Sequence, residues 1–174
     1  MTPDQLITLA SLIDTEAIGF PCYADWCDAL IRAEDAPPTW VLELSVERTP
    51  RKAAEILLAQ ANYVMSERWH ILETGHLATA YAFLKYRSGR TSWEDFLRTA
   101  VLISHAKYSV WPTSDFERFL EAYVENELAS SIAHAQAKHL EQVLDEELNE
   151  LASLHAVFPL EPLSKGPARM DAAT

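Results

Sequence analysis

The chain is 174 residues long, 49% hydrophobic and 23% charged, and it carries a net charge of −12. This composition is typical of a globular protein and excludes a disordered chain, and the length suits one helical domain, which we place at residues 1–158. Because nucleic acids and anionic membranes are polyanions, the negative charge argues against both as partners. The charge either serves solubility alone or favours a basic protein partner.

Glycine occurs only at positions 19, 75, 89 and 166. A β-sandwich or barrel needs more tight turns than four glycines supply, so we expect an all-α fold. The first basic residue is Arg32, and no apolar run reaches the roughly 18 residues of a membrane span. Cys22 and Cys27 are five residues apart and lie on different faces of a predicted helix. We therefore expect a cytoplasmic protein with two reduced thiols.

Two helices are predicted at the amino-terminal end. Thr2 before Pro3 is typical of a helix start, and apolar residues then recur at helical spacing over residues 3–14. A second amphipathic pattern covers residues 22–34 and ends before two adjacent prolines.

Residues 39–48 carry a conflicting pattern. Trp40, Leu42, Leu44 and Val46 alternate with polar residues in the period of two that is typical of a half-buried strand. No second strand is evident, and a solitary strand leaves its backbone groups unpaired. We therefore favour a short helix, with a lone strand that pairs with another chain as the alternative.

Three further helices are predicted in the middle of the chain. Thr49 and Pro50 begin a helix that runs to about residue 73, and Gly75 allows a break before a helix at 76–87. The sequence Thr91-Ser92-Trp93-Glu94 has the form of a capping box and starts a helix that reaches about residue 108.

The carboxy-terminal part has no glycine or proline between Ser114 and Pro159. One straight helix of that length would extend about 60 Å, whereas a compact domain of this size is roughly 40 Å across. We therefore expect a break near Ser130-Ser131, with helices at about 115–130 and 132–156. Residues 159–174 are rich in proline and are expected to form a flexible tail. The predicted fold is an irregular bundle of about six to eight helices with a long carboxy-terminal helical segment.

Two patterns in the sequence bear on catalysis or metal binding. Glu67 to His70 and Glu73 to His76 resemble the Glu-x-x-His spacing of di-iron carboxylate bundles. Those bundles place the two copies on different helices, whereas here both copies lie on one helix and rotate away from each other. We therefore expect no metal and no cofactor.

Arg98 and His105 resemble the Arg-x(4–6)-His spacing of HEPN ribonucleases, which are also small helical bundles. That resemblance implies RNA cleavage by these two residues. An enzyme that cleaves RNA must attract a polyanion, however, and the net charge of −12 opposes that. The alternative is a buried or half-buried His105 that is satisfied by a neighbouring group.

Acidic and basic residues are unevenly distributed along the chain. Residues 1–47 have a net charge of −8, residues 48–107 of +4, and residues 115–155 of −8. Neighbouring helices can pair these charges, or they can leave one negative face for a basic protein. The carboxylates that we predict to bind such a partner are Glu117, Glu121, Glu125, Glu141, Asp145, Glu146 and Glu150.

These observations favour a non-catalytic protein that captures a basic protein partner through acidic helices. In size and charge the chain resembles immunity proteins that neutralise cationic nuclease toxins. Two alternatives remain: a helical-bundle enzyme, using a metal or acting on RNA, and a module that self-associates, for example as a homodimer.

Overall fold

The computed structural model describes residues 1–61, 74–105 and 113–164. These ranges contain helices and no strand, which confirms the all-α prediction. The helices are α1 (Pro3–Asp14), α2 (Phe20–Ala33), α3 (Thr39–Val46), α4 (Pro50–Gln60), α6 (Thr74–Arg87), α7 (Trp93–His105), α8 (Thr113–Glu125), α9 (Ser130–Val143), α10 (Asp145–His155) and α11 (Glu161–Ser164).

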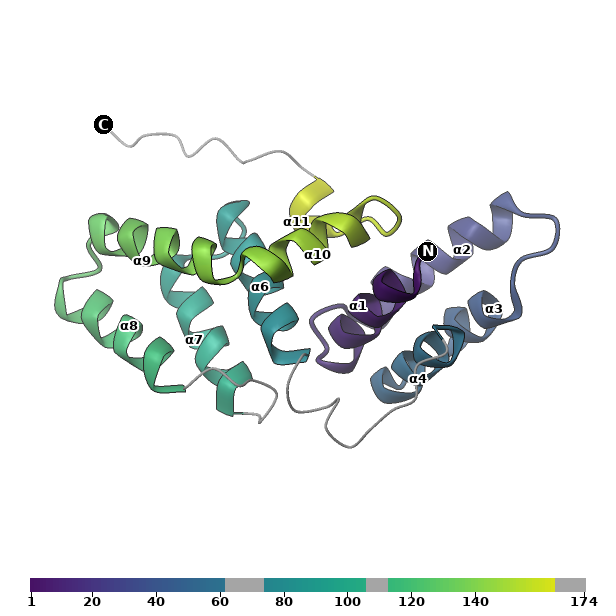
Figure 1. Cartoon of the computed structure of the whole chain (residues 1–174), viewed down its shortest axis with the longest axis horizontal. Helices are drawn as coiled ribbons and strands as arrows, with labels where there is room; N and C mark the ends of the chain where they lie inside the picture. Colours follow the sequence, from purple (N-terminus) through teal and green to yellow (C-terminus); the bar gives the residue numbers. More distant parts are fainter. Residues whose placement is uncertain (62–73, 106–112, 165–174) are drawn as a thin grey trace.

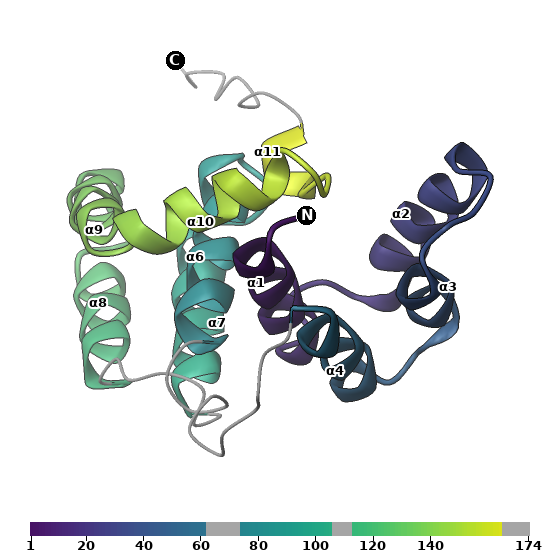
Figure 2. The same cartoon turned by 45° about the vertical axis from the view of Figure 1, so that its right-hand side comes forward.

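The helices are arranged along an elongated molecule (Figures 1 and 2). At one end α1 packs against α4, and α2 packs against α3. Toward the other end α6 packs against α7, α7 against α8, and α8 against α9. Helix α10 contacts both α6 and α1. Helix α10 therefore joins the two ends of the bundle.

Local signals place several helix ends where the sequence predicts them. Thr2 and Gln5 form a capping box at the start of α1, with each side chain bonded to the other residue's backbone N–H. The capping box of α7 lies one residue later than predicted, because Ser92 rather than Thr91 caps the helix and accepts a hydrogen bond of 3.1 Å from the Asp95 amide. Gly89 has φ 71° just after α6, where only glycine adopts a left-handed conformation at low cost.

Residues 39–46 form helix α3, so the favoured interpretation of this segment is confirmed and the lone strand is wrong. Val41 and Leu44 are buried on one face of α3. Leu42 and Val46 are exposed instead, and they are two of the apolar residues that produce the strand-like alternation. Because the fold does not bury them, they do not contribute to the core.

The long carboxy-terminal stretch is broken twice. The first break is a turn between α8 and α9, a few residues before the predicted position at Ser130-Ser131, and Glu127 and Leu128 have positive φ there. The second break, between α9 and α10, lies at Leu144 and was not predicted. The breaks, together with the four-residue α11, bring the described helices to ten, more than the six to eight expected.

The predicted flexible tail, 159–174, begins with packed residues. Phe158 and Leu160 are fully buried, and α11 packs against α6. The Trp26 indole N–H donates a hydrogen bond of 3.1 Å to the Val157 carbonyl, and the Trp26 and Phe158 rings are 5.3 Å apart. The chain is therefore anchored on the bundle through residue 163, and residues 165–174 of the predicted tail lie outside the described residues.

Candidate functional site

The acidic residues predicted to bind a partner are divided between two helical segments. Glu117, Glu121 and Glu125 lie on α8, whereas Glu141 lies in the last turn of α9 and Asp145, Glu146 and Glu150 lie on α10. Several are already engaged: Glu141 pairs with Arg87 at 3.0 Å and Glu117 lies 3.3 Å from the His105 ring. In the described part of the chain, Glu121, Glu125 and Glu146 make no ion pair. Basic residues from the middle of the chain therefore pair with part of the acidic carboxy-terminal segment. This is the first of the two alternatives that the charge distribution allowed, namely charge pairing between neighbouring helices.

The residues considered for catalysis are not brought together by the described structure. Arg98 binds Glu94 on its own helix, with N–O distances of 3.0 and 2.6 Å, while His105 faces Glu117 on α8. Residues 67, 70 and 73 of the considered metal pattern lie outside the described ranges. His76 of that pattern contacts Glu147 at 3.1 Å, and in the described ranges no three metal-ligating side chains converge.

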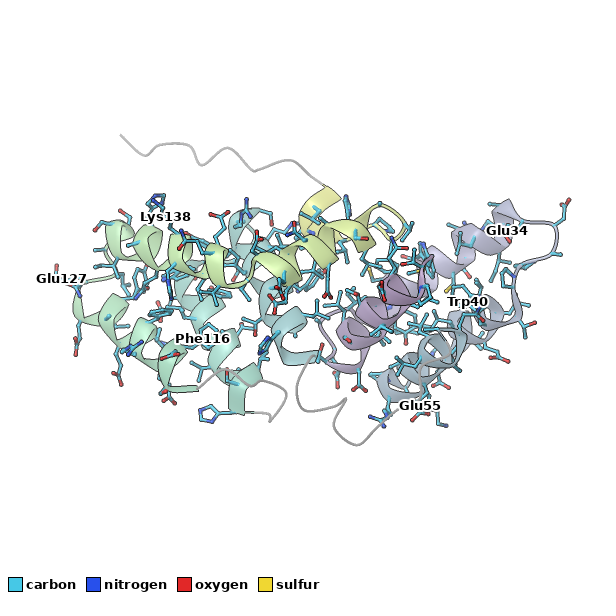
Figure 3. The ribbon with its side chains drawn as sticks, in the orientation of Figure 1. Glu34, Trp40, Glu55, Phe116, Glu127 and Lys138 are labelled. Atoms are coloured by element: carbon cyan, nitrogen blue, oxygen red, sulfur yellow. The ribbon has the colours of Figure 1, made fainter. Side chains whose placement is uncertain are left out.

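A groove lies between α3 and α4, at the end of the molecule opposite the turn that carries Glu127 (Figure 3). It has a volume of about 640 Å³, in the range of protein binding sites. One face of each helix lines it, with Thr39, Trp40 and Glu43 from α3, Glu47 directly after α3, and Lys52, Glu55, Ile56, Ala59 and Gln60 from α4. These spacings of one, three and four residues place each set on a single side of its helix.

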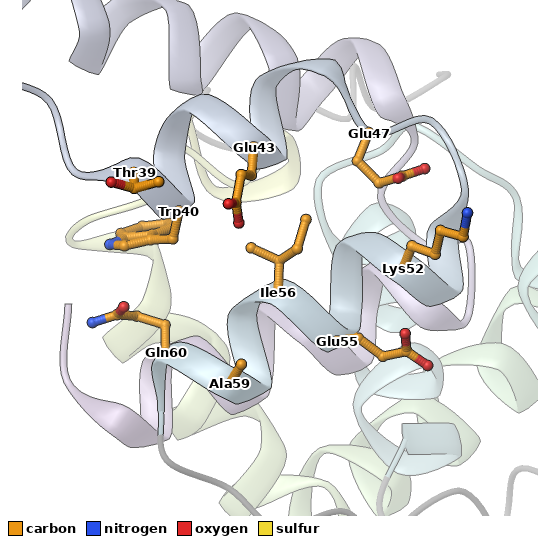
Figure 4. A pocket seen from close by; sticks show the side chains of 9 residues that line it. All are labelled: Thr39, Trp40, Glu43, Glu47, Lys52, Glu55, Ile56, Ala59 and Gln60. Atoms are coloured by element: carbon orange, nitrogen blue, oxygen red, sulfur yellow. The ribbon is translucent and has the colours of Figure 1, made fainter.

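The side chains meet across the groove in order along its length (Figure 4). Trp40 lies opposite Gln60 at one end, Glu43 lies opposite Ile56 in the middle, and Glu47 lies opposite Lys52 at the other end. The groove therefore has an apolar floor, an aromatic end and a charged end.

Trp40 is held from behind by the protein core. Its ring lies 6.2 Å from that of Trp26, which is itself fixed by the hydrogen bond to Val157 and by contact with Phe158. The half-buried Trp40 side chain still borders the groove. A ring fixed in this way loses little conformational freedom when a ligand stacks on it.

Three carboxylates and one ammonium group line the groove. Glu55 pairs with Arg51 at 3.0 Å, and Glu47 accepts a hydrogen bond of 2.7 Å from the Thr49 amide. That bond lowers the pKa of Glu47, as does the nearby Lys52 ammonium to a smaller degree, so this carboxylate stays ionised. Among the described residues, Glu43 has neither an ion pair nor a hydrogen bond.

Two exposed apolar side chains lie on α3 outside the lining of the groove. Val46 is 73% exposed and Leu42 is 44% exposed. At 100° per residue, Val46 projects about 60° away from Glu43, so it lies beside the face of α3 that lines the groove. The groove was not predicted from the sequence, and of the four alternating apolar residues at 40–46 only Trp40 lines it.

A second cavity, of about 260 Å³, lies among the end of α1, α6 and α7. Its charged lining residues are Glu16 and Lys85, and the Lys85 ammonium lies 4.8 Å above the Tyr81 ring. Because one carboxylate balances one ammonium group, this cavity favours neither a cation nor an anion. The groove between α3 and α4 is the better candidate for charge-directed binding.

None of the described helices combines the length and the hydropathy that crossing a membrane requires. Comparisons with protein-family models, with curated proteins and with solved structures find no match to this chain.

Proposed function

We propose that this chain is a non-catalytic binding protein that captures a basic protein partner, with the groove between α3 and α4 as its docking site. The observation that supports this best is the groove itself: an apolar floor edged by three carboxylates and one ammonium group. Such a surface attracts a cationic partner over a distance and then buries its apolar side chains.

The mode of action that we propose is occlusion, in the manner of immunity proteins that block cationic nuclease toxins. An acidic surface competes with the polyanion that a basic nuclease binds, and this needs no reaction chemistry. The free Cys22 and Cys27 thiols fit a reducing compartment, which supports the proposal that the capture takes place in the cytoplasm.

The test begins with affinity capture from the cells that make this chain, followed by kinetics with the purified partner. We expect a partner with a basic surface, and an association rate that falls at least about tenfold between low and high salt, because steering by charge is screened. An association rate that is the same at low and high salt would refute charge-directed capture.

Matched variants then locate the docking surface. The triple substitution Glu43→Gln, Glu47→Gln and Glu55→Gln removes three charges from the groove. The control, Glu117→Gln, Glu121→Gln and Glu125→Gln, removes three charges from α8, which carries three of the seven carboxylates that our sequence prediction assigned to the contact. We expect the groove variant to lose most of the affinity and the α8 variant to lose only the small part that follows from slower association. The opposite result would move the docking site to α8.

A further inference from the structure

The middle of the groove presents a carboxylate that the fold itself does not use. Glu43 lies three residues after Trp40 on α3, so the two side chains are neighbours on one helix face. Across from them are Gln60 and Ile56 (Figure 4). In the described structure neither an ion pair nor a hydrogen bond engages Glu43, whereas Glu47 and Glu55 each have a local partner.

Three of these side chains match the chemistry of an arginine. A guanidinium group is planar, stacks on an aromatic ring and donates two parallel hydrogen bonds to a carboxylate. The Trp40 ring supplies the stacking surface, Glu43 supplies the carboxylate, and the Gln60 amide oxygen supplies a further acceptor. Lysine has a compact charge with no flat face, so it gains the ion pair without the stacking.

The shape of the site indicates a helical ligand. The groove runs between two helices, and its lining along α3 extends from residue 39 to residue 47, the residue that follows the helix, a span of about 12 Å or two helical turns. An amphipathic helix that lies along it places apolar residues at spacings of three and four over Ile56 and Ala59. Leu42 and Val46 would flank such a helix and lose their exposure to water.

We propose that the groove between α3 and α4 binds an arginine-bearing amphipathic helix of the basic partner, with the guanidinium group stacked on Trp40 and paired with Glu43. This inference rests on the proposed function and adds the residue and the secondary structure that the groove recognises. It follows that the groove prefers arginine to lysine at this one position.

The test uses a defined probe and the full chain labelled with ¹⁵N. The probe is an alanine-based helical peptide of about four turns with leucines at i, i+3 and i+7 and one arginine beside them. Three matched peptides carry lysine, glutamine or glutamate in place of the arginine. Binding is followed by amide shifts and by the Trp40 indole signal, which is assigned with the variant Trp40→Phe.

We expect the arginine peptide to shift signals of α3, α4 and the Trp40 indole. Its affinity should exceed that of the lysine peptide about fivefold and that of the glutamate peptide by more. Glu43→Gln should remove the preference for arginine, while the control Glu34→Gln, at the exposed end of α2, should leave it unchanged.

Three outcomes would overturn the inference: equal affinity for the arginine and lysine peptides, shifts confined to α8, or no binding at millimolar peptide. The inference also fails if sedimentation shows that the chain forms a dimer and substitution of Leu42 and Val46 abolishes that dimer. A second copy of the chain would then cover these two side chains. None of these outcomes contradicts the proposed function, provided that the parent chain captures a basic partner in a salt-dependent way and the groove triple variant does not. It fails separately if that capture is absent.

Discussion

A buried glutamine connects three helices in the carboxy-terminal half. Gln136 on α9 is 9% exposed. Its side-chain oxygen accepts a hydrogen bond of 2.9 Å from the Trp93 indole N–H on α7, and its amide nitrogen donates one of 3.0 Å to the Phe119 carbonyl on α8. Replacing Gln136 with leucine keeps most of the volume and removes both bonds.

The cost of Gln136→Leu follows from what the substitution leaves behind. The buried Trp93 N–H loses its acceptor, which costs about 1–3 kcal/mol, whereas the Phe119 carbonyl keeps the helical bond of its own backbone and loses about 1 kcal/mol. The added apolar burial of leucine returns roughly 1 kcal/mol. We therefore expect a net loss of about 2 kcal/mol, which lowers the melting temperature by about 4–8 °C in a chain of this size.

The assay is urea unfolding followed by far-ultraviolet circular dichroism, which the loss of a tryptophan does not disturb. The exposed Gln142→Leu on the same helix is the control, and it should stay within about 0.5 kcal/mol of the parent chain. In a double-mutant cycle with Trp93→Phe, the loss of unfolding free energy in the double variant should be smaller than the sum of the two single losses by at least about 1 kcal/mol. Additive losses, or an unchanged stability of Gln136→Leu, would show that the bonds do not connect these helices as described.

Three other expectations can be checked on the same chain. Leu128 has φ 60° and is 47% exposed, so Leu128→Gly should raise the unfolding free energy by about 1 kcal/mol in urea titrations, whereas a loss would mean that the side chain packs. The His76 hydrogen bond lowers the pKa of Glu147. The stability that this carboxylate contributes is present above its unfolded pKa of about 4.3 and is lost as the pH falls through the lower folded value, so Glu147→Gln should flatten the acid limb of the stability curve. Burial raises the pKa of Cys27 to about 12, so a thiol reagent near neutral pH should modify Cys27 only after unfolding, and rapid modification in the native state would contradict its burial.

Helix boundaries were predictable where local chemistry sets them. The Thr2 cap, the Ser92 cap and the left-handed Gly89 involve residues within a few positions of one another. The interruption at Leu144 has no such signal, because neither glycine nor proline marks it. It lies where α9, packed on α8, gives way to α10, which crosses α6 and α1. A break set by contacts so distant in the sequence is not encoded in any short pattern.

The site was harder to predict than the fold, because charge along a sequence does not reveal distance. Glu141 was predicted to bind a partner, but in the structure it forms an ion pair of 3.0 Å with Arg87. Glu43, in contrast, was one acid among nine in residues 1–47, and only its position in the groove between α3 and α4 distinguishes it. The exposed Leu42 and Val46 were visible in the sequence but were interpreted as a strand signal.

The two acidic ends of the molecule should contribute to binding in different ways. Glu121 and Glu125 are exposed carboxylates on α8, where water screens them, so they act mainly on the rate of encounter. Glu43 lies over Ile56 beside an aromatic ring, and a helix bound in the groove would exclude water from it. A charge pair that is shielded from water attracts more strongly than an exposed one. Removing the Glu43 charge should therefore speed dissociation of the partner, whereas removing the α8 charges should slow its association and leave the dissociation rate almost unchanged.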